Sequence, residues 1–248
     1  MLTITSVKNP QIAALKALKN RAARQELGAY LVEGIKMVQE AASRPGLARH
    51  LYVTEETLPL FEGVDCPITL ISENVLSALC DTKTPQGVVC LVNLPQKACL
   101  GERIIVMDGV QDPGNVGTIL RTADAAGFTG ALMSQACADP YSPKVLRATM
   151  GSIFRLPVET AADLPGALNA LAAEGFSVLS SQLDGEPFFE RGPVGEKFAL
   201  VIGNEGNGVS DEVKAVATHR LALPMRGGAE SLNAAIAAGI MMYDLTCR

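Results

Sequence analysis

The pattern of apolar and polar positions changes near residue 94 of this 248-residue chain. Before that point, short apolar runs such as AYLVEG and GVVCLV alternate with short stretches of helical period, which predicts a small α/β module over residues 1–94. The periodicity lapses around Pro95 and Gly101, so a linker is expected over residues 95–102. Residues 103–248 then form a second predicted domain.

Short apolar runs alternate with stretches of helical period throughout this second domain. The runs that predict strands cover residues 103–108, 130–134, 154–158, 176–181, 198–203 and 220–225. The stretches that predict helices cover residues 115–127, 142–151, 163–175, 210–218 and 231–247. Strands joined by helices of this length form parallel sheets covered on both faces, so an α/β fold with a parallel sheet is expected.

Composition indicates a soluble protein without a metal centre. Hydrophobic residues make up 48% of the chain, enough for an ordinary core, and the longest apolar runs fall far short of the roughly 20 residues that span a bilayer. The first residues include lysine and polar side chains, unlike a signal peptide. The six cysteines form no C-x-x-C pair and lie far from both histidines. We therefore expect a cytoplasmic protein with no membrane segment and no metal.

Charge is distributed unevenly. Residues 1–50 contain eight Lys and Arg against three Asp and Glu, whereas the remainder contains 13 against 23. The stretch NPQIAALKALKNR predicts an amphipathic helix with a basic face, capped by Asn9 and with Pro10 at its first position. A basic module on an acidic body is typical of a nucleic-acid-binding segment, but a solvated helix face gives the same pattern.

Three glycine-rich turns follow predicted strands, namely DPGNVGT, GNEGNGVS and RGGAES. Ligands of open parallel sheets bind at the carboxyl ends of strands, and glycines allow a ligand close to the backbone. None of the turns matches a dinucleotide or nucleoside-triphosphate loop, which disfavours both enzyme classes. Each turn alone could be a plain tight connection, whereas all three together favour a binding site.

One arginine stands on the helix that follows the first turn. Val116, Ile119, Leu120, Ala123 and Gly127 recur at helical spacing and predict its buried face. Arg121 lies about 140° around the helix from Val116 and should point away from the sheet, toward solvent, a partner subunit or a substrate. Alternatively, it is a surface arginine paired with Asp124.

The last predicted helix begins with SLNAAIAAG, where Ser231 is the expected N-cap. Its small residues allow another chain segment to pack very closely against it.

Taken together, the segments DGVQDPGNVGTILRTADAAGF, LVIGNEGNGVS and LALPMRGGAESLNAAIAAG resemble the SpoU/TrmH family of RNA ribose 2′-O-methyltransferases of the SPOUT class. The resemblance covers residues 103–248 in family order and spacing. RQELGAYLVEGIKMVQEA and TKTPQGVVCLV resemble the family's RNA-binding module more weakly. The resemblance implies a C-terminal trefoil knot, a homodimer and an RNA substrate, with ribosomal RNA favoured over transfer RNA.

The resemblance also implies S-adenosylmethionine as cofactor and assigns residues to roles. The implied cofactor-binding residues are Gly203, Leu223, Met225, Ser231 and Leu232. The implied catalytic residues are Asn115, Arg121, Glu205, Ser231 and Asn233. We expect RNA contacts from Lys8, Lys16, Lys19, Arg21, Arg24, Lys144 and Arg147.

Arg121 could act in either of two ways. Contact with an RNA phosphate could make it a transient proton acceptor, or it could stay charged and stabilise the developing alkoxide while water or phosphate takes the proton. Two other functions fit the same fold: a non-catalytic RNA-binding accessory protein, and a methyltransferase acting on a protein or a small molecule. The intact Asn115, Arg121, Glu205 and Asn233 argue against the first, and the basic first 50 residues argue against the second.

Overall fold

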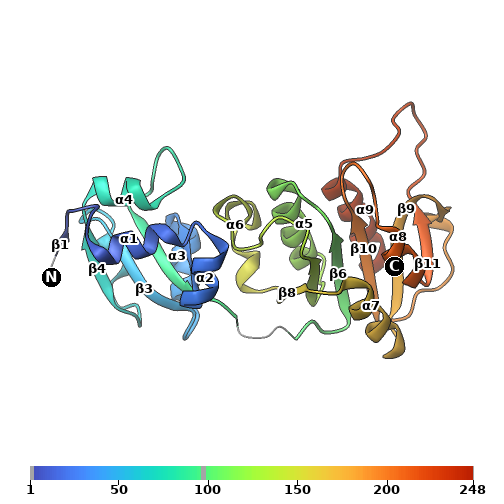
Figure 1. Ribbon diagram of the computed structural model, residues 1–248, viewed down its shortest axis with the longest axis horizontal. Coiled ribbons are helices and arrows are strands. Elements are labelled where there is room, and N and C mark those ends of the chain that lie inside the picture. The colour runs from blue at the N-terminus through green and yellow to red at the C-terminus, as the bar shows by residue number, and fades with distance from the viewer. Residues whose placement is uncertain (1–2, 96–98, 248) are drawn as a thin grey trace. The chain divides into compact units, whose positions relative to one another are not determined.

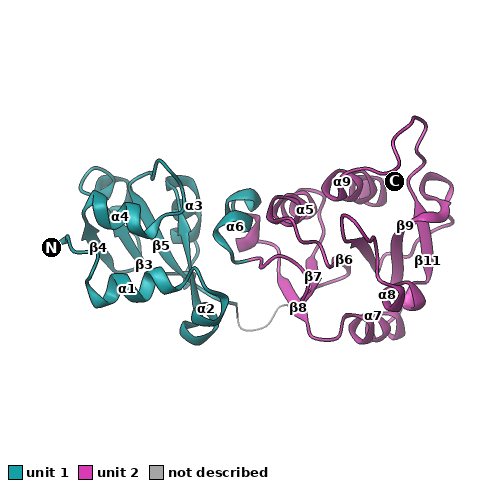
Figure 2. Ribbon diagram, turned by 45° about the horizontal axis from the view of Figure 1, so that its top comes forward, with its two compact units in different colours: residues 1–96, 141–151 teal, residues 97–140, 152–248 magenta. Residues whose placement is uncertain are grey.

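The chain forms two compact units in a computed structural model (Figure 2). The structure describes residues 3–95 and 99–247. Unit 1 comprises residues 1–96 and 141–151, and unit 2 comprises residues 97–140 and 152–248.

Unit 1 is built on a mixed five-stranded sheet with strand order β1-β4-β3-β5-β2. The strands are β1 (Thr3–Ile4), β2 (Ala29–Glu33), β3 (Ala48–Val53), β4 (Ile68–Ile71) and β5 (Val88–Asn93). The helices are α1 (Pro10–Ala17), α2 (Arg21–Leu27), α3 (Ile35–Ala42) and α4 (Glu73–Leu79), with a 3-10 turn at Leu58–Phe61. Strand β5 runs antiparallel to both β2 and β3, while β1, β3 and β4 are parallel.

The basic stretch near the N-terminus forms two helices rather than one. Asn9 caps α1 by accepting a hydrogen bond from the Gln11 N–H, and Pro10 occupies the first turn, as predicted. The helix ends at Ala17 because Asn20 starts a new one, its side-chain oxygen accepting from the Ala22 N–H at 2.8 Å. An asparagine that can cap its own helix therefore interrupts the predicted continuous helix.

Unit 2 contains a six-stranded sheet with order β11-β9-β10-β6-β7-β8, in which every neighbouring pair is parallel. The strands are β6 (Arg103–Asp108), β7 (Gly130–Ser134), β8 (Val158–Ala161), β9 (Ser177–Pro187), β10 (Phe198–Gly203) and β11 (His219–Ala222). The helices are α5 (Pro113–Ala125), α7 (Leu164–Ala173), α8 (Asp211–Val216) and α9 (Ala234–Cys247), with 3-10 turns at Ser152–Phe154 and Phe188–Glu190. The predicted parallel α/β sheet is confirmed.

Helices cover both faces of this sheet (Figure 1). Alternate strand residues such as Ile104 and Val106 pack with Leu168 of α7 and Val213 of α8. Helices α5 and α9 pack against each other on the opposite face. A Cβ placed on Gly239 of α9 would lie 3.6 Å from Thr122 Cγ2 of α5, so the small residues of α9 pack beside α5.

The position of β8 differs from the prediction. The strand predicted over residues 154–158 is wrong, because a 3-10 turn ends at Phe154 and β8 begins only at Val158. Pro157 has no N–H to donate to a strand ladder, so pairing starts after it. The predicted linker ends at Gly101 and Glu102, immediately before β6, while its residues 96–98 lie outside the described part of the chain.

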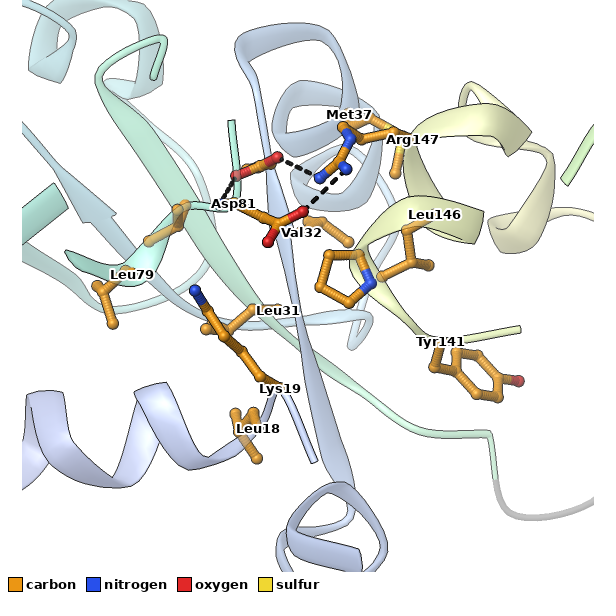
Figure 3. Close-up of a pocket in the computed structure, with 13 residues that line it drawn as sticks. Leu18, Lys19, Leu31, Val32, Met37, Leu79, Asp81, Tyr141, Leu146 and Arg147 are labelled. Atoms are coloured by element: carbon orange, nitrogen blue, oxygen red, sulfur yellow. Dashed lines mark hydrogen bonds and ion pairs between the residues drawn. The ribbon is translucent and has the colours of Figure 1, made fainter. Parts of the chain in front are cut away.

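Helix α6 (Pro143–Thr149) belongs to unit 1, although the sequence pattern places it within the second domain. The Tyr141 ring lies 4.9 Å from the Tyr30 ring, centroid to centroid. Arg147 forms ion pairs with Glu33 and Asp81, each at 2.9 Å (Figure 3). These contacts hold α6 on unit 1, and a periodic pattern cannot show which unit a helix packs against.

Candidate active site

The three glycine-rich turns lie at one edge of the unit 2 sheet. Strands β6 and β10 are parallel neighbours, and their last residues, Asp108 and Gly203, stand opposite each other in the register. The Asn204 side chain donates to the Gly109 carbonyl at 2.8 Å, and the Ser210 N–H donates to the Asp108 carboxylate at 2.8 Å. The first two turns are therefore bonded together as a preformed structure.

A hydrogen-bond network joins all three turns. The Asn115 amide donates to Glu205 Oε1 at 2.9 Å, and the Asn233 amide donates to Asn115 Oδ1 at 2.9 Å. Glu205 also accepts from the backbone N–H groups of Gln111 and Asp112, each at 3.1 Å. Three of the residues implied to be catalytic, from distant parts of the sequence, thus fix one another's side-chain positions.

Protonation of Glu205 should weaken this network. Burial raises the pKa of its carboxyl, but hydrogen bonds from the Asn115 side chain and from backbone N–H groups lower the pKa by more, leaving it below its ordinary value of 4.5. The stabilisation is therefore present above the ordinary pKa and is lost as the pH falls through the folded-state pKa. We expect Glu205→Gln to reduce the free energy of unfolding at pH 7, and the difference from wild type to shrink in urea titrations as the pH falls below the ordinary carboxyl pKa of 4.5. A difference that stays constant across that range would contradict this role for the carboxylate.

A pocket of about 510 Å³ lies beside the network, a size typical of small-ligand sites. Its lining includes all five residues implied to bind a cofactor, Gly203, Leu223, Met225, Ser231 and Leu232, and also Glu205 and Asn233. The middle of β9, just after the residues that pair with β10, supplies Ser181, Gln182, Leu183 and Asp184, which the sequence reasoning missed. The polar residues at the end of that predicted strand were the available signal, because ligands bind at carboxyl ends of strands.

The chemistry of this lining fits S-adenosylmethionine. Leu223, Met225 and Leu232 offer apolar surface for a flat ring, while Ser231 and Asn233 offer polar groups. Gly203 permits the tight turn beside the pocket, since a Cβ there would lie 2.2 Å from the Gly208 carbonyl carbon and the Val209 nitrogen. Only glycine lets the chain close at this point.

The start of α9 differs from the prediction. The helix begins at Ala234, and Asn233 rather than Ser231 caps it. Asn233 Oδ1 accepts from the N–H groups of Ala235 and Ile236, at 2.9 and 3.2 Å. Asn233 therefore uses its oxygen to cap the helix and its amide to hold Asn115, and Ser231 is left to line the pocket.

Arg121 lies exposed on α5, as predicted from the helical projection. The alternative pairing with Asp124 is wrong, because Asp124 forms its ion pair with Arg155 at 2.7 Å. Arg121 forms no hydrogen bond or ion pair with any described residue, and it is not among the residues that line the pocket of its own chain.

The burial of Arg24 contradicts its expected contact with RNA, whereas the prediction for Arg147 stays, although its side chain is ion-paired within unit 1. Arg24 is only 3% exposed and donates to the Leu18 carbonyl at 2.6 Å, so it supports the turn between α1 and α2. Arg147 is engaged by the carboxylates of Glu33 and Asp81, which neutralise its charge. The others have exposed side chains and stay predictions: Lys8, Lys16, Lys19, Arg21 and Lys144.

Within the described residues, no helix has the length and hydropathy of a membrane span, and no cluster of three or more His, Cys, Asp or Glu side chains could hold a metal.

These features define a class of protein, namely a parallel α/β domain with a pocket beside the carboxyl edge of its sheet, lined by β9 and by the segments around the second and third glycine-rich turns. Residues 102–243 match the SpoU rRNA Methylase family, and residues 9–90 match the MRM3-like substrate binding domain. The chain belongs to the SpoU rRNA methylase family.

Known relatives resemble the chain over its whole length. The 23S rRNA (guanosine(2553)-2′-O)-methyltransferase RlmP of Bacillus subtilis is 37% identical, covering 99% of both chains. The crystal structure of an AdoMet-bound rRNA methyltransferase from Sinorhizobium meliloti is 30% identical with a TM-score of 0.86, covering 98% of this chain and 97% of that one. The methyltransferase AviRb from Streptomyces viridochromogenes, solved with AdoMet, is 26% identical with a TM-score of 0.87, covering 97% and 98%.

Proposed function

We propose that the protein transfers a methyl group from S-adenosylmethionine to a ribose 2′-hydroxyl of ribosomal RNA. The observation that carries the proposal is the bonded network of Asn115, Glu205 and Asn233 beside the pocket that contains the five residues implied to bind the cofactor. The relative from Bacillus subtilis acts on 23S ribosomal RNA, which favours ribosomal over transfer RNA.

In this proposal the bound cofactor supplies a methyl group on a positively charged sulfur. The protein holds the 2′-oxygen in line with that methyl group, and such positioning can lower the barrier by several kcal/mol. Arg121 stays charged and stabilises the negative charge that develops on the 2′-oxygen, while water or an RNA phosphate takes the hydroxyl proton. In the alternative, the guanidinium first gives a proton to a bound RNA phosphate and then accepts the proton of the 2′-hydroxyl. Asn115 and Glu205, already fixed by their mutual bond, hold the site in shape for that step.

The exposed position of Arg121 supports a shared active site between two copies of the chain. Helix α9 packs on α5, which carries Arg121, and presents Ile236, Ile240 and Tyr243 to solvent, with 55%, 39% and 46% of each residue exposed. These residues recur every three or four positions and form one apolar stripe, a feature typical of subunit interfaces. We propose a homodimer in which Arg121 of one copy completes the site of the other.

Replacing the stripe should separate the copies and abolish transfer. We expect Ile236→Asp/Ile240→Asp to be monomeric at micromolar concentration by light scattering, because two buried carboxylates would oppose the interface. Methyl transfer should be lost together with the dimer. As a control, Leu60→Asp carries a new charge on an exposed residue of unit 1 and should leave the dimer intact. A double variant that stays dimeric, or a wild-type chain that is monomeric, would contradict the shared site.

Two further features belong to the same proposal. The similarity to the family supports a trefoil knot in the C-terminal part of unit 2, where α9 packs against α5. The substrate class supports a cytoplasmic location.

The substrate class can be tested by offering unmodified ribosomal RNA and unmodified transfer RNA separately with methyl-labelled S-adenosylmethionine. We expect label in the ribosomal fraction. Label confined to transfer RNA would correct the substrate, and binding of cofactor and RNA without any transfer would favour the accessory, non-catalytic role.

A further inference from the structure

A pocket of about 1020 Å³ in unit 1 lies between two segments that the methyl-transfer reaction does not use. One segment is the start of α3, within VEGIKM, and the other is the loop TKTPQG before β5. Residues Tyr141–Gly151, which pack on unit 1, add Arg147 and Met150 to the lining.

The walls of this pocket are fixed by short contacts. Gln86 Oε1 accepts from the Ile35 N–H at 3.0 Å and so binds the loop to the start of α3. Gly34 has a φ of 94°, which side-chain-bearing residues rarely adopt. Gly87 has a φ of 78°, and its carbonyl accepts from Thr57 Oγ1 at 2.6 Å and from the Thr54 N–H at 2.9 Å. The pocket is therefore preformed rather than a gap between loose loops.

Met150 stands out at the pocket. Its φ is 49°, and among the described residues it is the one non-glycine residue with a positive φ. It is the left-handed C-cap of α6, a position that usually holds glycine, and it is 56% exposed. The cap therefore presents a large apolar side chain at the pocket, and a thioether adapts well to a flat ring.

The lining carries mixed chemistry. Ile35, Met37 and Met150 supply apolar surface, while the Glu56 carboxylate accepts hydrogen bonds and the Gln86 amide still has its donor group available. Acidic side chains outnumber basic ones, which does not suit a groove for phosphates alone. Lys36 lines the pocket and Lys83 lies on the neighbouring loop, and both side chains are exposed. They can therefore bind a phosphate group of a nucleotide whose base occupies the pocket.

We propose that this pocket binds an unpaired nucleotide of the RNA substrate, as a recognition site that takes no part in methyl transfer. Ile35, Met37 and Met150 contact the face of the base, and Glu56 and Gln86 bind its edge. Sequence-specific RNA recognition uses unstacked bases in this way. Because a carboxylate accepts N–H groups, a base with an amino group fits best. The inference rests on the proposed RNA-directed function, and the match of residues 9–90 to a substrate binding domain supports it.

The test measures binding of the full-length protein to an unmodified in vitro transcript of 23S ribosomal RNA, by filter retention over a series of salt concentrations. Met150→Gly relieves the backbone strain, so the fold should be kept, whereas the apolar contact is lost. Glu56→Ala removes the edge-binding carboxylate. Leu60→Ala, which alters another exposed apolar residue of unit 1 outside the pocket, is the matched control.

We expect each pocket variant to lose about tenfold in RNA affinity, as for loss of a base contact, with an unchanged salt slope and unchanged S-adenosylmethionine binding. Leu60→Ala should bind like wild type. If the Glu56 carboxylate only repelled RNA phosphates, removing it would increase RNA affinity, so tighter binding by Glu56→Ala would overturn the proposal. Wild-type affinity of both pocket variants would overturn it as well. If wild type itself fails to bind the transcript, the RNA-directed function fails as well; if wild type binds and the pocket variants match it, only the nucleotide site fails.

Discussion

Arg121→Ala is expected to lower methyl transfer by about a thousandfold or more, the range reported for loss of a single charge-stabilising or proton-transferring group. The variant should fold and bind S-adenosylmethionine as wild type does. The reason is structural: Arg121 is exposed, forms no bond with the described part of its own chain, and does not line the cofactor pocket. Rates of labelled methyl transfer and calorimetric cofactor binding measure the two effects separately.

Two controls sharpen this experiment. Arg155→Ala removes a nearby guanidinium that is bound to Asp124 and should retain most of the activity. Mixing Arg121→Ala with Asn233→Ala subunits should recover part of the activity, because a mixed dimer contains one site in which both residues are native. Near-normal turnover by Arg121→Ala would exclude both proposed roles of the arginine, and the absence of recovery in mixed dimers would place the arginine and the pocket in the same chain.

Gly203→Ala is expected to abolish detectable cofactor binding and to destabilise unit 2. The added Cβ would lie 2.2 Å from backbone atoms of Gly208 and Val209, closer than nonbonded atoms approach, so the second turn would have to open. That turn carries Glu205 and lines the pocket. We expect at least a hundredfold weaker binding by calorimetry and a lower melting temperature, since overpacking against backbone costs about 1–3 kcal/mol or more.

Gly206 offers a matched control within the same turn. A Cβ at Gly206 would lie 3.6 Å from Asn204 Oδ1, an ordinary contact, and its φ is not positive. Gly206→Ala should therefore bind cofactor nearly as well as wild type. Equal effects of the two substitutions would show that the turn as a whole, rather than the closure at Gly203, determines binding.

Local features of the fold could be predicted from the sequence because each depends on neighbouring residues. The Asn9 cap, the apolar strand at Arg103–Asp108 and the outward direction of Arg121 all follow from short patterns. The break between α1 and α2 was missed because Asn20 reads equally well as a residue within a polar helix face. Strand β8 was predicted too early because the apolar residues around Pro157 fit a strand pattern. Pro157 has no N–H for the strand ladder, and β8 therefore begins only after it.

Features that depend on distant contacts could not be predicted in this way. Arg24 is buried against the Leu18 carbonyl, and Arg147 is ion-paired with Glu33 and Asp81, which are far from it in the sequence. A basic residue looks the same in the sequence whether it binds RNA or a group of its own chain. The packing of α6 on unit 1 could not be predicted for the same reason, because it depends on contacts with residues distant in the sequence. The cofactor residues were predicted as a set from family resemblance, whereas the contribution of β9 became visible only once strand order was known.

The most direct test of the central claim is the chemical identity of the methylated product. Wild-type protein and Arg121→Ala are incubated with methyl-labelled S-adenosylmethionine and unmodified total RNA, and the digested nucleosides are separated and identified. We expect a 2′-O-methylated nucleoside from ribosomal RNA with wild type and none with the variant. Label on a base, label in protein, or no label despite bound cofactor and RNA would contradict the proposed reaction.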